Sequence, residues 1–127
     1  MAGGADAPHL PRPAAIEAYG NGGFRFGGMS HRGSILCFPD GIWAWPVTNV
    51  AELNGALLAS VFARADALDF FLIGAGRDPW VLPQALRERF RDKSLSVDTM
   101  ATGAAVRTYN ILLAEGRRAG AGLIAVD

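Results

Sequence analysis

The stretch LDFFLIGAG, residues 68–76, decides the fold of this 127-residue chain. Its first six residues are apolar except for Asp69, and a run this continuous predicts a central strand that is covered on both faces. A strand with one solvated face would instead alternate between apolar and polar residues. Gly74 and Gly76 end the predicted strand. Because both faces of this strand are expected to be buried, other segments of the chain must supply a covering layer on each side.

The N-terminal half is predicted to be mainly β. Residues 16–19 and 24–26 flank a glycine-rich turn at 20–23, which predicts a hairpin. Two further apolar runs, residues 34–38 and 42–46, are separated by Pro39-Asp40-Gly41, which is a strong turn signal. His31 is assigned to a turn that ends at Gly33.

Three helices are predicted in the rest of the chain. Asn49 and Glu52 have the spacing of a capping box, which predicts a helix from there to about Arg64. A second helix begins after Asp78, with Pro79 or Pro83 in its first turn, and its expected apolar stripe is Leu82, Ala85, Leu86 and Phe90. Thr102 is expected to cap a third helix, whose small residues Gly103, Ala104 and Ala105 allow a close approach to a neighbouring backbone.

Two strands complete the predicted α/β domain. Residues 94–98 form a short strand, and residues 119–126 form a closing strand that is weakened by Gly120 and Gly122. We expect a disordered arm at residues 1–14 and one α/β domain at residues 15–127, because half of the residues are hydrophobic and the length suits a single core.

Charge and composition narrow the classes of partner. Twelve basic and twelve acidic residues leave no net charge, which argues against nucleic acid as a partner. The longest apolar stretch is too short to span a membrane.

Cys37 is the single cysteine, and its apolar neighbours favour a buried thiol over a reactive one. Residues 1–14 resemble no secretory signal, so we expect a protein of the cytoplasm, a reducing compartment.

Glycines after the buried strand suggest one candidate site. Gly74 and Gly76 precede a helix, where exposed N–H groups can bind an anion or small ligand, but Pro79 replaces the third glycine of a dinucleotide motif. A tight structural turn is the alternative. The candidate pocket combines this loop with polar residues nearby and on the third helix: Gly74, Gly76, Arg77, Thr102, Arg107, Thr108, Tyr109 and Asn110.

Structural roles are the other interpretation of these polar residues, and the one we favour. Arg107 can pair with Glu115, Tyr109 can pack in the core, and Asn110 can fix an adjacent loop. Trp43 and Trp45 point to the same side of one strand, so they are candidates for a protein interface or for burial on the first helix. The two histidines and one cysteine give no catalytic triad or metal set, and we predict no catalytic residue, metal or cofactor.

Three segments resemble a known family: GGFRFGGMSHRGSILCFPDGIWAW, LIGAGRD and MATGAAVRTYNILLAEGRRAGAGLI. The family consists of small α/β domains of largely unassigned function, and it includes the third alpha-subcomplex assembly factor of mitochondrial complex I and the adipogenesis-associated domain protein. The resemblance implies three layers, with helices packed on a central mixed sheet and an additional β-hairpin. It implies no reaction, and the chain has no recognisable mitochondrial transit segment.

Three functions follow from these observations as hypotheses. The first is a non-catalytic assembly factor or adaptor, whose protein partner is a membrane complex or its assembly intermediates and which sits at the inner membrane through that partner. The second is a small-ligand binder or enzyme at the Gly74–Gly76 loop and residues 107–110. The third is a homodimer that forms through Trp43, Trp45 or a sheet edge.

Overall fold

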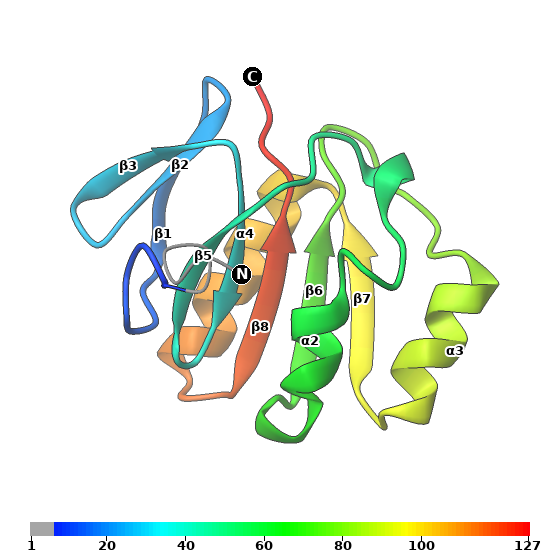
Figure 1. The fold of residues 1–127 in the computed structure, drawn as a ribbon. Helices are drawn as coiled ribbons and strands as arrows, with labels where there is room; N and C mark the ends of the chain where they lie inside the picture. The colour runs from blue at the N-terminus through cyan, green and yellow to red at the C-terminus, as the bar shows by residue number, and fades with distance from the viewer. Residues whose placement is uncertain (1–6) are drawn as a thin grey trace.

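The computed structural model describes residues 7–127 and has three layers (Figure 1). A five-stranded sheet lies in the middle, with order β5-β4-β8-β6-β7. Its strands are β4 (Ser34–Phe38), β5 (Gly41–Trp45), β6 (Phe70–Gly74), β7 (Ser96–Met100) and β8 (Ala119–Leu123). β6 runs parallel to β7 and β8, whereas β4 runs antiparallel to β5 and β8, so the sheet is mixed. The predicted α/β architecture and the buried strand in LDFFLIGAG are confirmed.

Strand β8 is the middle strand of this sheet, although its glycines predicted a weak closing strand. All five of its residues are buried. A Cβ at Gly122 would lie 2.7 Å from the Trp45 ring, and a Cβ at Gly120 would lie 3.0 Å from the Phe71 ring. The glycines therefore make room for the aromatic side chains of Phe71 on the adjacent strand β6 and of Trp45 on β5, which is two strands away.

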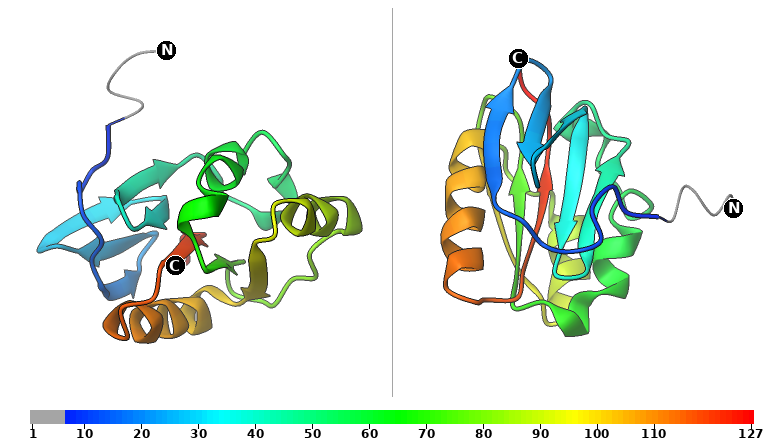
Figure 2. Two further views of the ribbon diagram at one scale, coloured as in Figure 1. Left: turned by 90° about the horizontal axis from the view of Figure 1, so that it is seen from below. Right: turned by 90° about the vertical axis from the view of Figure 1, so that its left-hand side faces the viewer.

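The predicted hairpin is confirmed and belongs to a three-stranded antiparallel sheet, β1 (Ile16–Gly20), β2 (Gly23–Phe26) and β3 (Met29–Arg32). The third strand was missed, because Gly27 and Gly28 indicated only a turn. His31 consequently lies on a strand and not in a turn. This small sheet and helix α4 (Thr102–Ala114) pack on the same face of the main sheet, where they bury Phe26, Ile35 and Tyr109 (Figure 2).

The first predicted helix is not continuous: only its first turn and residues 59–63 are helical. The capping box is present: Asn49 Oδ1 accepts a hydrogen bond from Ala51 N, and Glu52 Oε1 accepts one from Asn49 N. However, only a 3₁₀ turn, η1 (Val50–Glu52), follows, because Leu53 is extended. Asn54 Oδ1 then accepts a hydrogen bond from Leu57 N, which stabilises a separate turn instead of a continuous helix. Short elements follow: α2 (Ala59–Ala63) and η2 (Ala65–Ala67).

The second predicted helix is confirmed as α3 (Gln84–Asp92), which begins directly after Pro83. Leu86 and Phe90 are buried, but Ala85 is exposed although it was placed on the apolar stripe. Together, α2 and α3 cover the second face of the main sheet, where Phe62, Phe71 and Phe90 pack in one cluster. No helix within residues 7–127 is long and apolar enough to cross a membrane.

Part of the predicted N-terminal arm packs on the domain. Leu10 is buried and forms a β-bridge with Ile42 on strand β5. The N–H of Ile42 donates to the carbonyl of Leu10 over 2.9 Å, and the N–H of His9 donates to the carbonyl of Ile42 over 2.8 Å. Residues 1–6 of that arm lie outside the described residues.

Candidate functional site

Thr102 ties together two loops and does not cap helix α4 as predicted. The N-cap is Ala101, which places Thr102 at the first helical position. Its fully buried hydroxyl donates to the carbonyl of Ile124 over 2.7 Å and accepts from the N–H of Gly76 over 2.9 Å. Thr102 therefore holds the loop after β6 beside the segment after β8, at the edge where parallel strands end.

The next four candidate residues, Arg107 to Asn110, point in different directions. Arg107 is exposed and makes no hydrogen bond or ion pair within the described residues. The predicted pair with Glu115 is absent from that part of the chain. Thr108 is half-buried and directs its hydroxyl to Met100 Sδ, 3.7 Å away. Successive helix residues are separated by about 100° around the axis, so these side chains do not converge on one pocket with the glycine loop.

Asn110 holds strand β1 rather than a loop. Its Oδ1 accepts a hydrogen bond from the N–H of Ile16 over 2.8 Å, and its Nδ2 donates to the carbonyl of Ile16 over 3.0 Å. β1 is an edge strand of the small sheet, so no strand of the described chain lies on this side of Ile16. The amide of Asn110 therefore takes the place of a strand at that edge.

Tyr109 is a core residue, as its structural interpretation allowed. Its side chain is fully buried, and its hydroxyl makes no hydrogen bond within the described residues. The neighbouring thiol is that of Cys37, which is also fully buried. Burial raises the pKa of the Cys37 thiol and of the Tyr109 hydroxyl, so both groups stay protonated at neutral pH. The prediction of a buried cysteine is confirmed.

Gly74 and Gly76 have separate roles near one hollow. A Cβ at Gly74 would lie 3.0–3.1 Å from Leu123, Ala105 and Thr102, so the first turn of α4 approaches the strand closely. Gly76 has a φ of 108°, and its N–H is already bonded to Thr102. A hollow of about 480 Å³ lies beside this loop, between the segments 48–50, 75–80 and 124–127.

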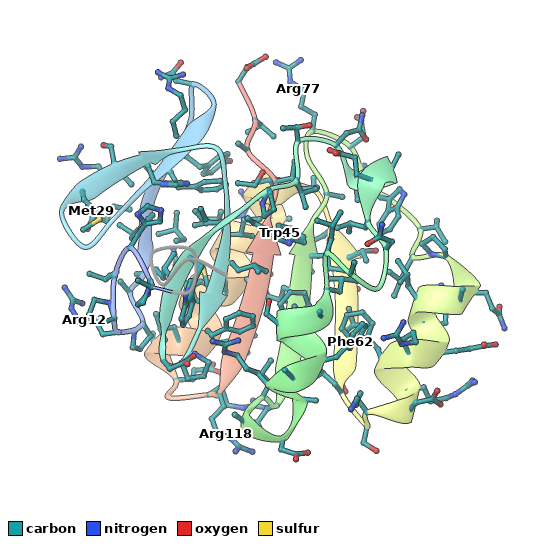
Figure 3. All side chains as sticks on the ribbon, in the orientation of Figure 1. Arg12, Met29, Trp45, Phe62, Arg77 and Arg118 are labelled. Carbon is teal, nitrogen blue, oxygen red and sulfur yellow. The ribbon has the colours of Figure 1, made fainter. Side chains whose placement is uncertain are left out.

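Arg77 is the candidate residue with the clearest access to this hollow. It is exposed and lies at the edge of the molecule where the C-terminus also ends (Figure 3). It makes no hydrogen bond or ion pair within residues 7–127. Arg107 to Asn110 do not line this hollow. The structure therefore separates the predicted pocket into a loop with Arg77 and a helix with other contacts.

Trp43 and Trp45 line a second hollow, of about 400 Å³, between β5 and α2. Trp45 is 3% exposed and donates from Nε1 to the carbonyl of Leu57 over 3.0 Å. Trp43 is half-buried and meets the Phe38 ring edge-on. The guanidinium of Arg64 lies 4.6 Å from the Trp43 ring centroid. Of the two tryptophans, Trp43 is the one with surface to offer a partner.

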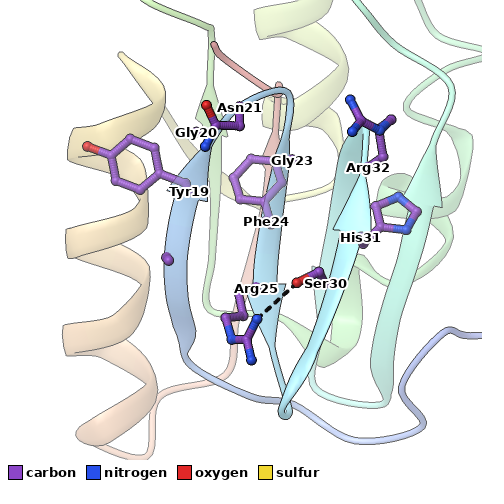
Figure 4. Close-up of a pocket in the computed structure, with 10 residues that line it drawn as sticks. Tyr19, Gly20, Asn21, Gly23, Phe24, Arg25, Ser30, His31 and Arg32 are labelled. Carbon is purple, nitrogen blue, oxygen red and sulfur yellow. Dashed lines mark hydrogen bonds between the residues drawn. The ribbon is translucent and has the colours of Figure 1, made fainter.

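A third hollow, which the sequence did not suggest, lies on the open face of the small sheet (Figure 4). Arg25 projects there, hydrogen-bonded to Ser30 Oγ over 3.1 Å and 3.6 Å from a carboxylate oxygen of Glu17. Arg32 lines the same hollow, of about 480 Å³. The alternation of Phe24, Arg25 and Phe26 was the available signal, because it places the arginine on the face opposite the two phenylalanines.

His31 lies at one side of this hollow and packs against the N-terminal arm. Its ring centroid is 4.6 Å from that of His9. Burial and the neighbouring His9 lower the pKa of His31, while a hydrogen bond with the Ser34 backbone opposes them. His31 is therefore mostly neutral at pH 7.

The three layers, the mixed main sheet and the small antiparallel sheet define a small three-layer α/β domain with surface hollows on both sides of the main sheet. This chain belongs to the family described as "Protein of unknown function (DUF498/DUF598)", whose model matches residues 16–124. The family resemblance inferred from the sequence is confirmed.

Relatives of this chain include one uncharacterised protein and several assembly factors. An uncharacterised protein of Rhodobacter capsulatus is 37% identical over 109 residues, which cover 86% of this chain and 82% of that protein. NADH dehydrogenase [ubiquinone] 1 alpha subcomplex assembly factor 3 of Rattus norvegicus is 24% identical over 91% of this chain and 62% of its own length. The chain thus spans less than two thirds of that assembly factor.

Solved structures share the fold. A crystal structure of an outer membrane protein from Bartonella henselae is 48% identical and superposes with a TM-score of 0.90, covering 94% of this chain and 100% of that one. An NMR structure of a Rhodopseudomonas palustris protein is 50% identical with a TM-score of 0.84, covering 99% and 93%.

Proposed function

We propose that this protein is a non-catalytic assembly factor or adaptor, which binds a protein partner while a membrane-bound respiratory complex is built. The observation that carries the proposal is the likeness to the NADH dehydrogenase assembly factors, which extends over 91% of this chain for the rat protein. A likeness of that extent covers the whole domain, including both packing faces of the main sheet, and is not restricted to one short motif. In this proposal the protein works in the cytoplasm and reaches the inner membrane through its partner.

The hollow at Trp43 is the docking surface that we favour for this partner. A half-buried tryptophan beside an arginine is a combination that often dominates the binding energy of protein interfaces. Arg64 is held over the Trp43 and Phe38 rings, at 4.6 and 4.4 Å, and pairs with Asp40 at 3.3 Å. Since this arrangement fixes the arginine before binding, less side-chain entropy is lost when a partner docks.

Affinity purification tests this proposal. The tagged protein is recovered from membranes of its source cells in a mild detergent, beside a Trp43→Ala variant and a Val81→Ala control; Val81 is 80% exposed and lies away from the hollow. We expect subunits of the NADH dehydrogenase or its assembly intermediates with the wild type and the control, and at least tenfold less with Trp43→Ala. Because Trp43 packs on Phe38, its loss lowers the melting temperature, so the three proteins are compared at a temperature at which circular dichroism shows each to be folded.

Deletion of the gene gives an independent result. We expect less fully assembled NADH dehydrogenase and an accumulation of its intermediates in membranes of the deletion strain. Recovery of the tagged protein alone, together with a normal amount of assembled complex after deletion, would overturn the proposal.

A small-ligand site beside Arg77 is a second proposed function, favoured by the unpaired, exposed guanidinium at the rim of a 480 Å³ hollow. Open α/β sheets bind ligands at this edge, beyond the carboxyl ends of their strands. A thermal-shift screen with nucleotides and organic anions tests it. A ligand at 100 times its Kd stabilises the fold by about 2.7 kcal/mol, and Arg77→Ala should abolish that shift. A screen in which no anion raises the melting temperature would refute this proposal.

A further inference from the structure

Helices α3 and α4 differ sharply on their outer faces. α3, QALRERFRD, carries five charged residues and presents most of them to solvent. α4, TGAAVRTYNILLA, carries Arg107 alone. Its outer side consists mainly of Ala104, Ile111 and Ala114 around that arginine. Ile111 is 59% exposed, which is among the highest values for a large apolar side chain in the described chain.

This outer face has no cover from the described chain. Both views in Figure 2 show α4 as the outermost element on its side of the main sheet. The opposite side of the helix buries Thr102, Ala105, Val106 and Tyr109. A helix that is apolar nearly all around its circumference is normally buried on all sides. The outer face of α4 is therefore suited to contact another molecule.

Two charged residues on the outer face of α4, Arg107 and Glu115, indicate which kind of molecule binds there. Arg107 precedes Ile111 by four residues and Glu115 follows it by four, so the three side chains form one ridge along the helix. Neither Arg107 nor the Glu115 side chain makes a hydrogen bond or ion pair within residues 7–127. Glu115 also sits at the C-terminal end of the helix, where the helix dipole disfavours a negative charge. A cationic side chain of another molecule beside Glu115 would offset this unfavourable interaction with the helix dipole.

We propose that the outer face of α4 binds the same face of a second copy of this chain, with the two helices antiparallel and a twofold axis at Ile111. In the commonest helix packing, ridges of residues four apart lie side by side. That packing sets Ile111 beside Ile111 of the second copy, and it sets each Arg107 beside Glu115 of the other chain. A twofold interface requires a self-complementary surface, and a ridge of cation, apolar residue and anion is one.

The size of the contact predicts a weak dimer. α4 has 13 residues and is about 20 Å long, and the small side chains beside Ile111 let the helices approach closely. One helix pair of that length buries less surface than the roughly 1,200–2,000 Å² of a stable complex. The Kd is therefore expected on the order of micromolar or higher, so the dimer forms only as concentration rises.

Sedimentation equilibrium from about 1 to 500 µM measures this association. Ile111→Arg should leave a folded monomer at every concentration, because the side chain is exposed and its replacement disturbs no core contact. Val81→Arg places the same charge on another exposed apolar residue, in the segment before α3, and should dimerise as the wild type does.

Charge exchange tests the register. Arg107→Glu and Glu115→Arg should each raise the Kd at least tenfold, because like charges then meet twice across the axis. The double variant with both changes should restore the wild-type Kd, and an equimolar mixture of the two single variants should form the heterodimer.

A wild-type chain that stays monomeric to 500 µM would overturn the proposal, as would a dimer that survives Ile111→Arg and so uses another surface, such as Trp43. Failure of the double variant to restore association would overturn the antiparallel register. Capture of respiratory subunits is a separate measurement, so this result and that of the proposed assembly role can be told apart.

Discussion

Replacing Asn110 with alanine is expected to destabilise the fold by about 2–4 kcal/mol, because two hydrogen bonds to Ile16 are lost together. Each bond contributes about 1 kcal/mol, and a buried backbone group left without a partner costs about 1–3 kcal/mol. Ile16 is 4% exposed, so water reaches its N–H and carbonyl poorly. For a domain of this length, about 4 °C are lost per kcal/mol, which gives a fall in melting temperature of roughly 8–16 °C.

Thermal unfolding followed by circular dichroism measures the loss, and amide hydrogen exchange shows where it occurs. Exchange should accelerate first in β1, whose open edge Asn110 occupies, and least in β8 at the centre of the main sheet. Thr108→Ala is the matched control in the same helix, because within residues 7–127 its hydroxyl makes a hydrogen bond only to Met100 Sδ, at 3.7 Å. A melting temperature for Asn110→Ala within 2 °C of the Thr108→Ala value would refute this reasoning.

Three further predictions concern other parts of the fold. Tyr109→Phe should change the free energy of unfolding by less than about 1 kcal/mol in chemical denaturation, because the buried hydroxyl it removes has no hydrogen-bond partner in the described residues. Gly122→Ala should destabilise by about 1–3 kcal/mol, measured in the same way, since its Cβ would lie 2.7 Å from the Trp45 ring; an unchanged midpoint would contradict this steric argument. Hydrogen bonds from Arg118 lower the pKa of Asp69, so this carboxylate stabilises the fold above its unfolded pKa of about 3.9 and the effect is lost as pH falls through the lower folded value. Asp69→Asn should therefore flatten the pH dependence of stability in that acidic range, and an identical pH profile would count against the role of Asp69.

Local patterns in the sequence predicted most individual elements. Continuous apolar residues in β6 and alternation in β2 each identified a strand, because these patterns follow from what the strand buries. The order of strands does not follow from such patterns. β8 lies at the centre of the sheet despite Gly120 and Gly122, because the rings of Phe71 and Trp45 fill the space that glycine side chains leave. Only the packing of distant segments reveals that fit.

The helix predicted from Asn49 to Arg64 is interrupted between η1 and α2 for a local reason. The capping box identified the first turn correctly, but the apolar spacing that followed did not reveal the extended Leu53 or the side-chain hydrogen bond of Asn54. Asparagine competes with the helix for backbone groups, and Gly55 next to it lowers helix propensity further. These two residues were the available signal for a break.

The sequence alone could have shown that the α4 residues of the predicted pocket do not all face one site. Four consecutive helix residues span nearly the whole circumference, so Arg107 to Asn110 cannot face one ligand. In the structure Tyr109 enters the core and Asn110 binds the edge of β1. Arg107 and Ile111, one turn apart, remain on the outside. The side chains that face inward assemble the domain, and any surface that α4 offers to a partner must therefore be built from the residues that face outward.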